Sequence, residues 1–169
     1  SAGDDYGIYN DSDTNRTGTI TTLTNTSTGV ISAARYGINN ESGSIITTLT
    51  NRGRISASGN SIGIYNNSST ITTLNNLQGK KTDSPLTYKG TLPTNYNVIV
   101  NGTDDYGKIT FSDVSGTTNF GVDLSSTLVA DTTYSSVLSG LSSSDITITL
   151  DKGHNSPSSL FGLTRYYWT

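Results

Sequence analysis

Apolar residues in the first half of the chain occur in short pieces separated by Asn, Ser, Gly and Asp. The spacing of an amphipathic helix, with apolar residues at i, i+3 and i+4 over a dozen positions, is missing there. Short pieces rich in Ile, Thr, Val and Tyr and bounded by turn-forming residues are typical of β-strands. The pattern therefore predicts an all-β fold.

The pieces are copies of three units. The first, Gly-Ile-Tyr-Asn or Gly-Ile-Asn-Asn, recurs after 30 and then 26 residues, and the second, Ile-Thr-Thr-Leu, recurs after 26 and then 25. A third unit, Gly-X-Ile-Ser, has two copies. The first unit stands at 7–10, 37–40 and 63–66, the second at 20–23, 46–49 and 71–74, and the third at 29–32 and 53–56. Such self-similarity predicts stacked units that bury their apolar sides against one another.

Three strands and three corners in each repeat fit one triangular coil of a parallel β-helix, which we expect to be right-handed. Residues 6–79 would form about three coils, within a repeat domain at 1–79. Coils stack about 4.8 Å apart, so equivalent residues should form ladders in the interior. The expected ladders are Ile8, Ile38 and Ile64; Ile20, Ile46 and Ile71; and Leu23, Leu49 and Leu74.

Two sets of asparagines fall into the same register and should form hydrogen-bonded stacks. They are Asn10, Asn40 and Asn66, and Asn25, Asn51 and Asn76. Residues 11–17 are longer than the corresponding segments of the other repeats and should form a loop at a corner. Two polar residues separate the apolar ones in Ile-Thr-Thr-Leu, so a bend between the threonines is expected.

After Asn76 the repeat fails, and residues 80–169 are predicted to form a non-repeating β cap over the last coil. A solenoid needs such a cap because its last coil would otherwise expose an open strand edge. The dipeptide Asn101-Gly102 indicates a hairpin turn, since both residues accept a positive φ. Strands are expected at 94–100, 107–111, 119–124, 134–138, 145–150 and 159–168.

The composition favours a thin-cored solenoid over disorder. Thr, Ser, Asn and Gly make up 88 of the 169 residues, while hydrophobic residues reach 31% and charged residues 14%. Disorder usually accompanies high net charge and few β-branched residues, whereas this chain has a net charge of −3 and abundant Thr and Ile. The acidic balance argues against nucleic acid as a partner. There is no cysteine, and no apolar run approaches the ~18 residues of a transmembrane helix.

The repeats resemble the passenger β-helix of bacterial autotransporters (type V secretion). The similarity extends to Gly-Thr-Leu-Pro-Thr-Asn-Tyr-Asn-Val-Ile-Val at 90–100, Tyr-Gly-Lys-Ile at 106–109, Ser-Thr-Leu at 126–128 and Thr-Tyr-Ser-Ser-Val-Leu-Ser-Gly at 133–140. The resemblance implies that the C-terminal region closes the β-helix and promotes its folding outside the cell, as an autochaperone does. It also implies a membrane barrel beyond this segment, so the segment itself would not insert into a membrane.

Candidate catalytic groups are few. The single histidine, His154, stands in a Gly-His-Asn-Ser-Pro stretch that reads as an exposed loop. Carboxylates lie in pairs at turns, where they initiate the turn or, alternatively, contribute to a Ca²⁺ site of six to eight oxygens. These pairs are Asp4 with Asp5, Asp104 with Asp105, and Asp11 with Asp13. We therefore predict no catalytic, cofactor-binding or metal-binding residues, and no enzyme activity.

Three surface features remain. Arg35, Arg52 and Arg54 form either a small basic patch or a solvated face. Tyrosines recur near the Gly-Ile unit, where they pack locally or present a stripe to a sugar or a neighbouring molecule. They are Tyr6, Tyr9, Tyr36 and Tyr65. Thr-Leu-Thr at 22–24 and 48–50 gives the array of an ice-binding solenoid, which Thr-Leu-Asn at 73–75 interrupts.

The expected function is that of a non-enzymatic scaffold at the bacterial cell surface, an adhesin-type passenger segment with a cap that drives folding. Its partners would be a host surface, a glycan or another copy. The alternative is a carbohydrate-active or sugar-binding β-helix whose active surface lies on coils upstream of residue 1. An ice-binding solenoid is a third and more distant possibility.

Overall fold

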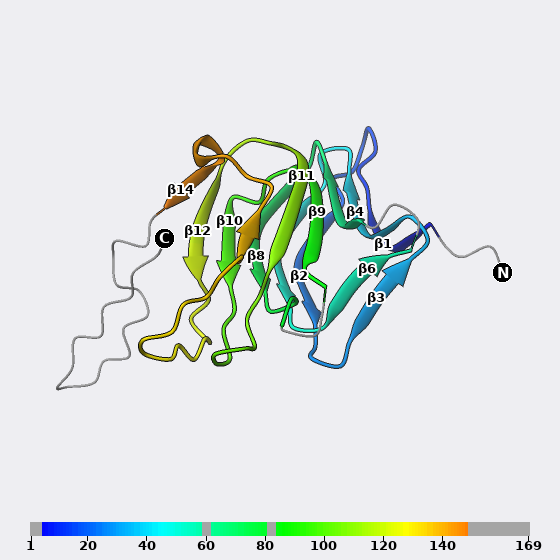
Figure 1. The fold of residues 1–169 in the computed structure, drawn as a ribbon. Coiled ribbons are helices and arrows are strands. Elements are labelled where there is room, and N and C mark those ends of the chain that lie inside the picture. Colours follow the sequence, from blue (N-terminus) through cyan, green and yellow to red (C-terminus); the bar gives the residue numbers. More distant parts are fainter. Residues whose placement is uncertain (1–4, 59–61, 81–83, 149–169) are drawn as a thin grey trace.

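The computed structural model describes residues 5–58, 62–80 and 84–148 of the chain, whose regular secondary structure is almost entirely β-strand (Figure 1). The strands of the first three repeats are β1 Tyr6–Asn10, β2 Thr19–Asn25, β3 Val30–Ala33, β4 Tyr36–Glu41, β5 Ile45–Asn51, β6 Arg54–Ala57, β7 Ile62–Asn67 and β8 Thr70–Asn76. Those that follow are β9 Leu86–Thr91, β10 Asn95–Val98, β11 Ile109–Ser115, β12 Thr118–Val122, β13 Leu138–Ser139 and β14 Ile146–Ile148. A short 3-10 helix, Ser143–Asp145, precedes β14.

The strands form three parallel sheets. The first sheet has the order β1-β4-β7-β9-β11-β13, the second has the order β14-β12-β10-β8-β5-β2, and β3 pairs with β6 in a third. Because consecutive strands of the chain alternate between sheets, the backbone winds as a β-solenoid of about five turns. The all-β parallel β-helix expected from the sequence is confirmed, and residues 6–79 make its first three turns.

The predicted interior ladders are present. Ile8 pairs with Ile38 and Ile38 with Ile64, and the second ladder of isoleucines and the leucine ladder pair in the same way on the second sheet. In the second and third turns these side chains are fully buried, whereas those of the first turn are only partly buried. The core is therefore best formed in the middle of the solenoid and thinnest at its first turn.

Both asparagine stacks are also present, at the corners where strands of the first two sheets end. Asn10 Nδ2 donates to Asn40 Oδ1 at 2.7 Å, and Asn40 Nδ2 donates to Asn66 Oδ1 at 2.8 Å. In the second stack, the Asn25-to-Asn51 bond is 2.9 Å and the Asn51-to-Asn76 bond is 3.1 Å. The same amides donate to corner carbonyls, such as those of Ile45 and Thr70, so the buried amides are satisfied within the protein.

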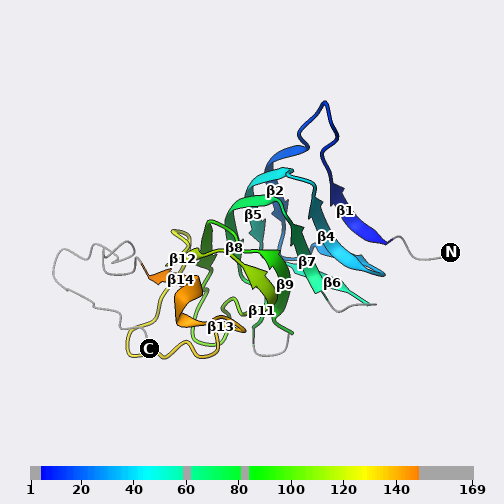
Figure 2. The same ribbon diagram turned by 90° about the horizontal axis from the view of Figure 1, so that it is seen from above.

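The glycine of the first repeat unit is required by a close approach between sheets. A Cβ at Gly37 would lie 2.8 Å from the Gly63 carbonyl oxygen and 2.8 Å from the Ile55 side chain. A Cβ at Gly7 would likewise lie 2.7 Å from the Gly37 carbonyl oxygen and 2.9 Å from the Ile31 side chain. The predicted corner loop also exists, because residues 11–18 connect β1 to β2 and project from the body of the solenoid (Figure 2).

Gln78 replaces a strand of the third sheet in the third turn. The Ile55 N–H donates to Gln78 Oε1 at 2.8 Å, and Gln78 Nε2 donates to the Ile55 carbonyl oxygen at 3.3 Å. The side-chain amide thus reproduces one backbone pairing on the free edge of β6. Gln78 Oε1 also accepts from Asn51 Nδ2 at 3.1 Å, which ties this edge to the asparagine stack. This explains why the Gly-X-Ile-Ser unit is missing after Asn76.

We expect Gln78→Ala to lower the free energy of unfolding by about 2–4 kcal/mol, because it leaves the buried N–H and carbonyl groups of Ile55 without these partners and removes one of the two acceptors of Asn51 Nδ2. Urea denaturation followed by circular dichroism measures this change. Asn101→Ala removes an exposed amide whose hydrogen bond within the described residues is to Asp105, and it should change stability by less than about 0.5 kcal/mol. A comparable loss in the two variants would contradict the role given to Gln78.

The solenoid continues beyond residue 79. Strands β9 and β10 pair in parallel with β7 and β8, and β11 and β12 continue the same two sheets. The interior ladders gain larger side chains here: Tyr88 and Phe111 follow Ile64, while Tyr96 and Phe120 follow Leu74. The sheets therefore cross the predicted boundary between the repeats and the cap.

The prediction of a hairpin at Asn101-Gly102 is wrong in one respect, because the turn does not join two strands of the same sheet. The turn exists, because Val100 and Tyr106 form an antiparallel bridge and the Asn101 N–H donates to the Asp105 carbonyl oxygen at 2.7 Å. However, the strands on either side of it, β10 and β11, belong to different sheets. The strand at Leu86–Thr91 was not predicted, and the one expected at 159–168 lies outside the described residues.

Candidate functional site

The second sheet presents two columns of polar residues on its outer side, where a column is a set of residues paired in register on successive strands. One column runs Thr22, Thr48, Thr73, Asn95 and Asn119, and the other runs Thr24, Thr50, Asn75, Asn97 and Gly121. The Thr-X-Thr pair required for an ice-binding array therefore occurs on two strands only. From β8 onward the columns are mainly asparagine.

These asparagine amides bond along their own columns. Asn75 Nδ2 donates to Thr50 Oγ1 at 3.2 Å, Asn97 Nδ2 to Asn75 Oδ1 at 2.9 Å, and Asn119 Nδ2 to Asn95 Oδ1 at 3.2 Å. Much of their hydrogen-bonding capacity is thus used within the protein. The outer side of the second sheet therefore stabilises the stacking of the coils more than it offers free polar groups to a ligand.

The outer side of the first sheet carries the tyrosine face, which we define as Tyr6, Tyr9, Tyr36 and Tyr65 on β1, β4 and β7. The rings of Tyr6 and Tyr9 stack with centroids 5.0 Å apart, and those of Tyr6 and Tyr36 stack at 6.1 Å. Tyr36 and Tyr65 lie 4.8 Å apart at a tilt of 41°. The predicted local packing of the tyrosines is confirmed, but Tyr9 remains 50% exposed.

Charged groups surround the tyrosine face. Tyr9 Oη donates to Asp11 Oδ2 at 3.0 Å and lies 3.4 Å from Glu41 Oε2. The bond to Asp11 raises the pKa of Tyr9 to about 12, and hydrogen bonds from Ser42 and then Tyr9 lower the pKa of Asp11. At the other end, the Arg35 guanidinium lies 5.3 Å from the centre of the Tyr36 ring.

Asn39 lies within this face and was not singled out from the sequence. It pairs with Tyr9 on one side and with Tyr65 on the other, so the two tyrosines are its neighbours in the column. Asn39 is fully buried, and neither Nδ2 nor Oδ1 has a hydrogen-bond partner among the described residues. The sequence feature that could have identified it is the single difference among the copies of the first repeat unit, in which Asn39 replaces the tyrosine of the other two copies.

The three arginines have separate contacts. Arg35 donates to Tyr6 Oη at 3.3 Å, Arg52 donates to Ser125 Oγ at 2.6 Å, and Arg54 donates to Ser56 Oγ at 3.3 Å. Arg54 also lines a shallow depression of about 400 Å³ beside β3 and β6, whose other lining residues are Ser and Ala. These contacts do not converge on one site.

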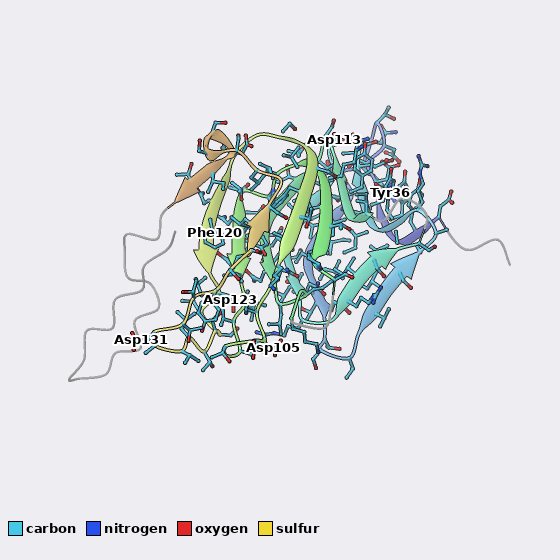
Figure 3. All side chains as sticks on the ribbon, viewed as in Figure 1. Tyr36, Asp105, Asp113, Phe120, Asp123 and Asp131 are labelled. Atoms are coloured by element: carbon cyan, nitrogen blue, oxygen red, sulfur yellow. The ribbon has the colours of Figure 1, made fainter. Side chains whose placement is uncertain are left out.

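The carboxylates lie at turns and bond locally. Asp11 accepts from the Ser12 N–H, Asp13 from the Asn15 N–H, and Asp105 from Asn101 Nδ2. Figure 3 shows Asp105, Asp123 and Asp131 on loops along one edge, away from Asp113 and Tyr36. In the described part of the chain, no three His, Cys, Asp or Glu residues lie together in a group that could hold a metal ion. Asp4 and His154 lie outside that part.

The described ranges contain no helix long and apolar enough to cross a membrane.

The tyrosine face with the buried Asn39 is the strongest candidate site in these ranges, because it combines an exposed aromatic ring with an unsatisfied amide. Comparison with protein-family models, curated proteins and solved structures finds no match to this chain.

Proposed function

We propose that this chain is a non-enzymatic scaffold segment of a bacterial surface protein, the passenger solenoid of an autotransporter-type adhesin. The observation that carries the proposal is the continuity of the parallel ladders from β1 to β14. In the first two sheets each strand leaves an edge of backbone groups on which the next strand can pair, and stacked asparagine amides hold the corners of the first three turns. A chain that emerges unfolded from a membrane could fold in this way, one turn at a time.

Two further features support an extracellular location. The chain has no cysteine, so no disulfide would have to form before or during export. The chain is rich in Thr and Asn and carries a net charge of only −3, which suits a rigid spacer that presents other surfaces to a partner. The partners proposed are a host surface, a glycan or another copy of the protein.

The test is to place residues 1–169 between an export signal and an autotransporter translocator in a bacterium. We expect the chain to reach the cell surface and to resist added protease there, because the solenoid folds after export. Ile46→Asp should reach the surface but be digested, since it disrupts the core of the second turn. Retention of the wild-type chain in the periplasm, or its digestion at the surface, would contradict the proposal.

A sugar-binding β-helix is the second candidate function. The tyrosine face is the specific observation that favours it, and this face lies on the chain itself and not on coils upstream of residue 1.

A further inference from the structure

Asn39 is held in an unfavourable position. Its neighbours Ile38 and Asn40 both belong to interior ladders, so alternation along β4 directs Asn39 to the outer side of the sheet. An outward side chain would normally be hydrated, yet this one is fully buried and neither of its amide atoms bonds to a described residue. A buried amide without partners costs free energy, which an apolar residue of similar size would avoid.

Tyr9 is the side chain that can uncover this amide. It neighbours Asn39 in the column, it is half-exposed, and its ring packs face to face only on Tyr6 among the described aromatic pairs. Its hydroxyl is held at the rim by Asp11, with Glu41 nearby. A change of the Tyr9 rotamer, with loss of its hydrogen bonds to Asp11 and Glu41, would expose the neighbouring Asn39 position beside the tyrosine rings.

We infer that this site binds a pyranose unit of a neutral oligosaccharide. The Asn39 amide supplies one acceptor and two donors, which match adjacent sugar hydroxyls that both donate and accept. The ring of Tyr9 provides an apolar surface for the C–H groups of the sugar, and aromatic walls with a few converging polar groups are the usual composition of ligand sites. Asp11 and Glu41 can accept from further hydroxyls at the rim.

The charges at the rim favour a neutral ligand over an acidic one. Two carboxylates, Asp11 and Glu41, lie beside Tyr9, whereas the Arg35 cation lies over Tyr36. An acidic glycan would meet like charges next to the ring on which it must stack. Further along the same column, Lys89 is paired with Asp113 at 2.8 Å and adds no net charge. The inference rests on the proposed extracellular role, because such oligosaccharides are met outside the cell.

The test uses the purified chain and calorimetric titration with maltohexaose, cellohexaose, mannohexaose and chitohexaose. We expect at least one to bind with a Kd between about 10 µM and 1 mM, and hexagalacturonate, an acidic control, to bind more weakly. Tyr9→Ala should weaken binding by about tenfold or more, as truncation of an aromatic anchor does. Tyr9→Phe, which keeps the ring, should bind within about threefold of the wild type.

Asn39→Ala separates binding from folding. It should also weaken binding by about tenfold or more, yet change the thermal midpoint little, because loss of the unsatisfied amide offsets the small cavity that the shorter side chain leaves. The matched control is Asn97→Ala on the second sheet, which breaks the 2.9 Å bond to Asn75 and should lower the midpoint while binding is retained.

Failure of all four neutral oligosaccharides to bind would overturn the inference, as would binding that survives both Tyr9→Ala and Asn39→Ala. Tighter binding of hexagalacturonate would overturn the choice of a neutral ligand. These outcomes are distinct from failure of the scaffold role, which is read from surface display and protease resistance of the exported chain.

Discussion

Ile46→Asp should unfold the first three turns of the solenoid. Ile46 is fully buried between Ile20 and Ile71 in one interior ladder. An aspartate there would place a charge among apolar side chains, at a cost of several kcal/mol. Because small domains are stable by about 5–15 kcal/mol in total, this loss consumes much of the stability available. Circular dichroism at 25 °C and urea denaturation measure the result, and Leu49→Asp should behave in the same way.

Two controls use the same new residue at exposed positions. Thr17 lies in the loop between β1 and β2, so Thr17→Asp should change the free energy of unfolding by less than about 0.5 kcal/mol. Thr47 is the exposed neighbour of Ile46 on β5, and Thr47→Asp should cost no more than about 1 kcal/mol, the span of strand propensities. Equal effects at Ile46 and Thr17 would show that the inward register assigned to β5 is wrong.

The interior of the first three turns could be predicted because its ladders are built from identical residues. Parallel coils place equivalent positions above one another, so three copies of Ile-Thr-Thr-Leu specify two ladders at once. The asparagine stacks followed from the same reasoning. The strands pair on both sides of Thr21 and Thr47 but not at these residues, and Ile46 and Leu49 both face inward although they are three positions apart. The alternation of inward and outward residues is therefore interrupted near the threonines, within one continuous strand, Ile45–Asn51.

The later turns were harder to predict because the ladders continue with different residues. Tyr88 and Phe111 continue the interior ladder of Ile64 on the next two strands of the sheet. The alternation of inward and outward residues therefore persists although the repeated sequence units do not. Gln78 is a stronger example, since a side chain performs the pairing of a backbone strand. Such a substitution leaves no periodic signal in the sequence.

The candidate site was predictable only in part. Recurrence of tyrosine near the Gly-Ile unit indicated a stripe on one side, and the structure confirms that the rings contact one another. Alternation along the strand places Asn39 outside, where hydration would be expected. Its burial depends on how the neighbouring rings lie, which is decided by packing in three dimensions.

The second large effect should appear when the chain is divided at residue 79. We expect a fragment of residues 80–169 to retain β-structure and residues 1–79 to be unfolded or aggregated. Loop closure does not favour either half, because Tyr88 and Phe111 are 23 residues apart and Ile38 and Ile64 are 26 apart. The difference lies in the core. The C-terminal half buries large aromatic side chains that contact one another, namely Tyr88, Tyr96, Phe111 and Phe120.

The N-terminal half has two disadvantages. The apolar residues of its first turn, Ile8, Ile20, Leu23 and Ile31, are only partly buried. The cut also removes acceptors at its other end, since Asn66 donates to the Thr91 carbonyl oxygen at 2.7 Å and Asn76 donates to that of Lys108 at 3.2 Å. Both edges of the fragment would then be open to pairing with other chains.

Circular dichroism, limited proteolysis and size-exclusion chromatography on the two fragments measure the outcome. Adding residues 80–169 to residues 1–79 should increase the β-signal beyond the sum of the parts, because β9 and β10 offer the edges on which β7 and β8 pair. The Gln78→Ala change, placed in residues 1–79, should reduce this gain. A protease-resistant 1–79 fragment beside an unfolded 80–169 fragment would reverse the proposed direction of folding, since the N-terminal turns would then nucleate the solenoid.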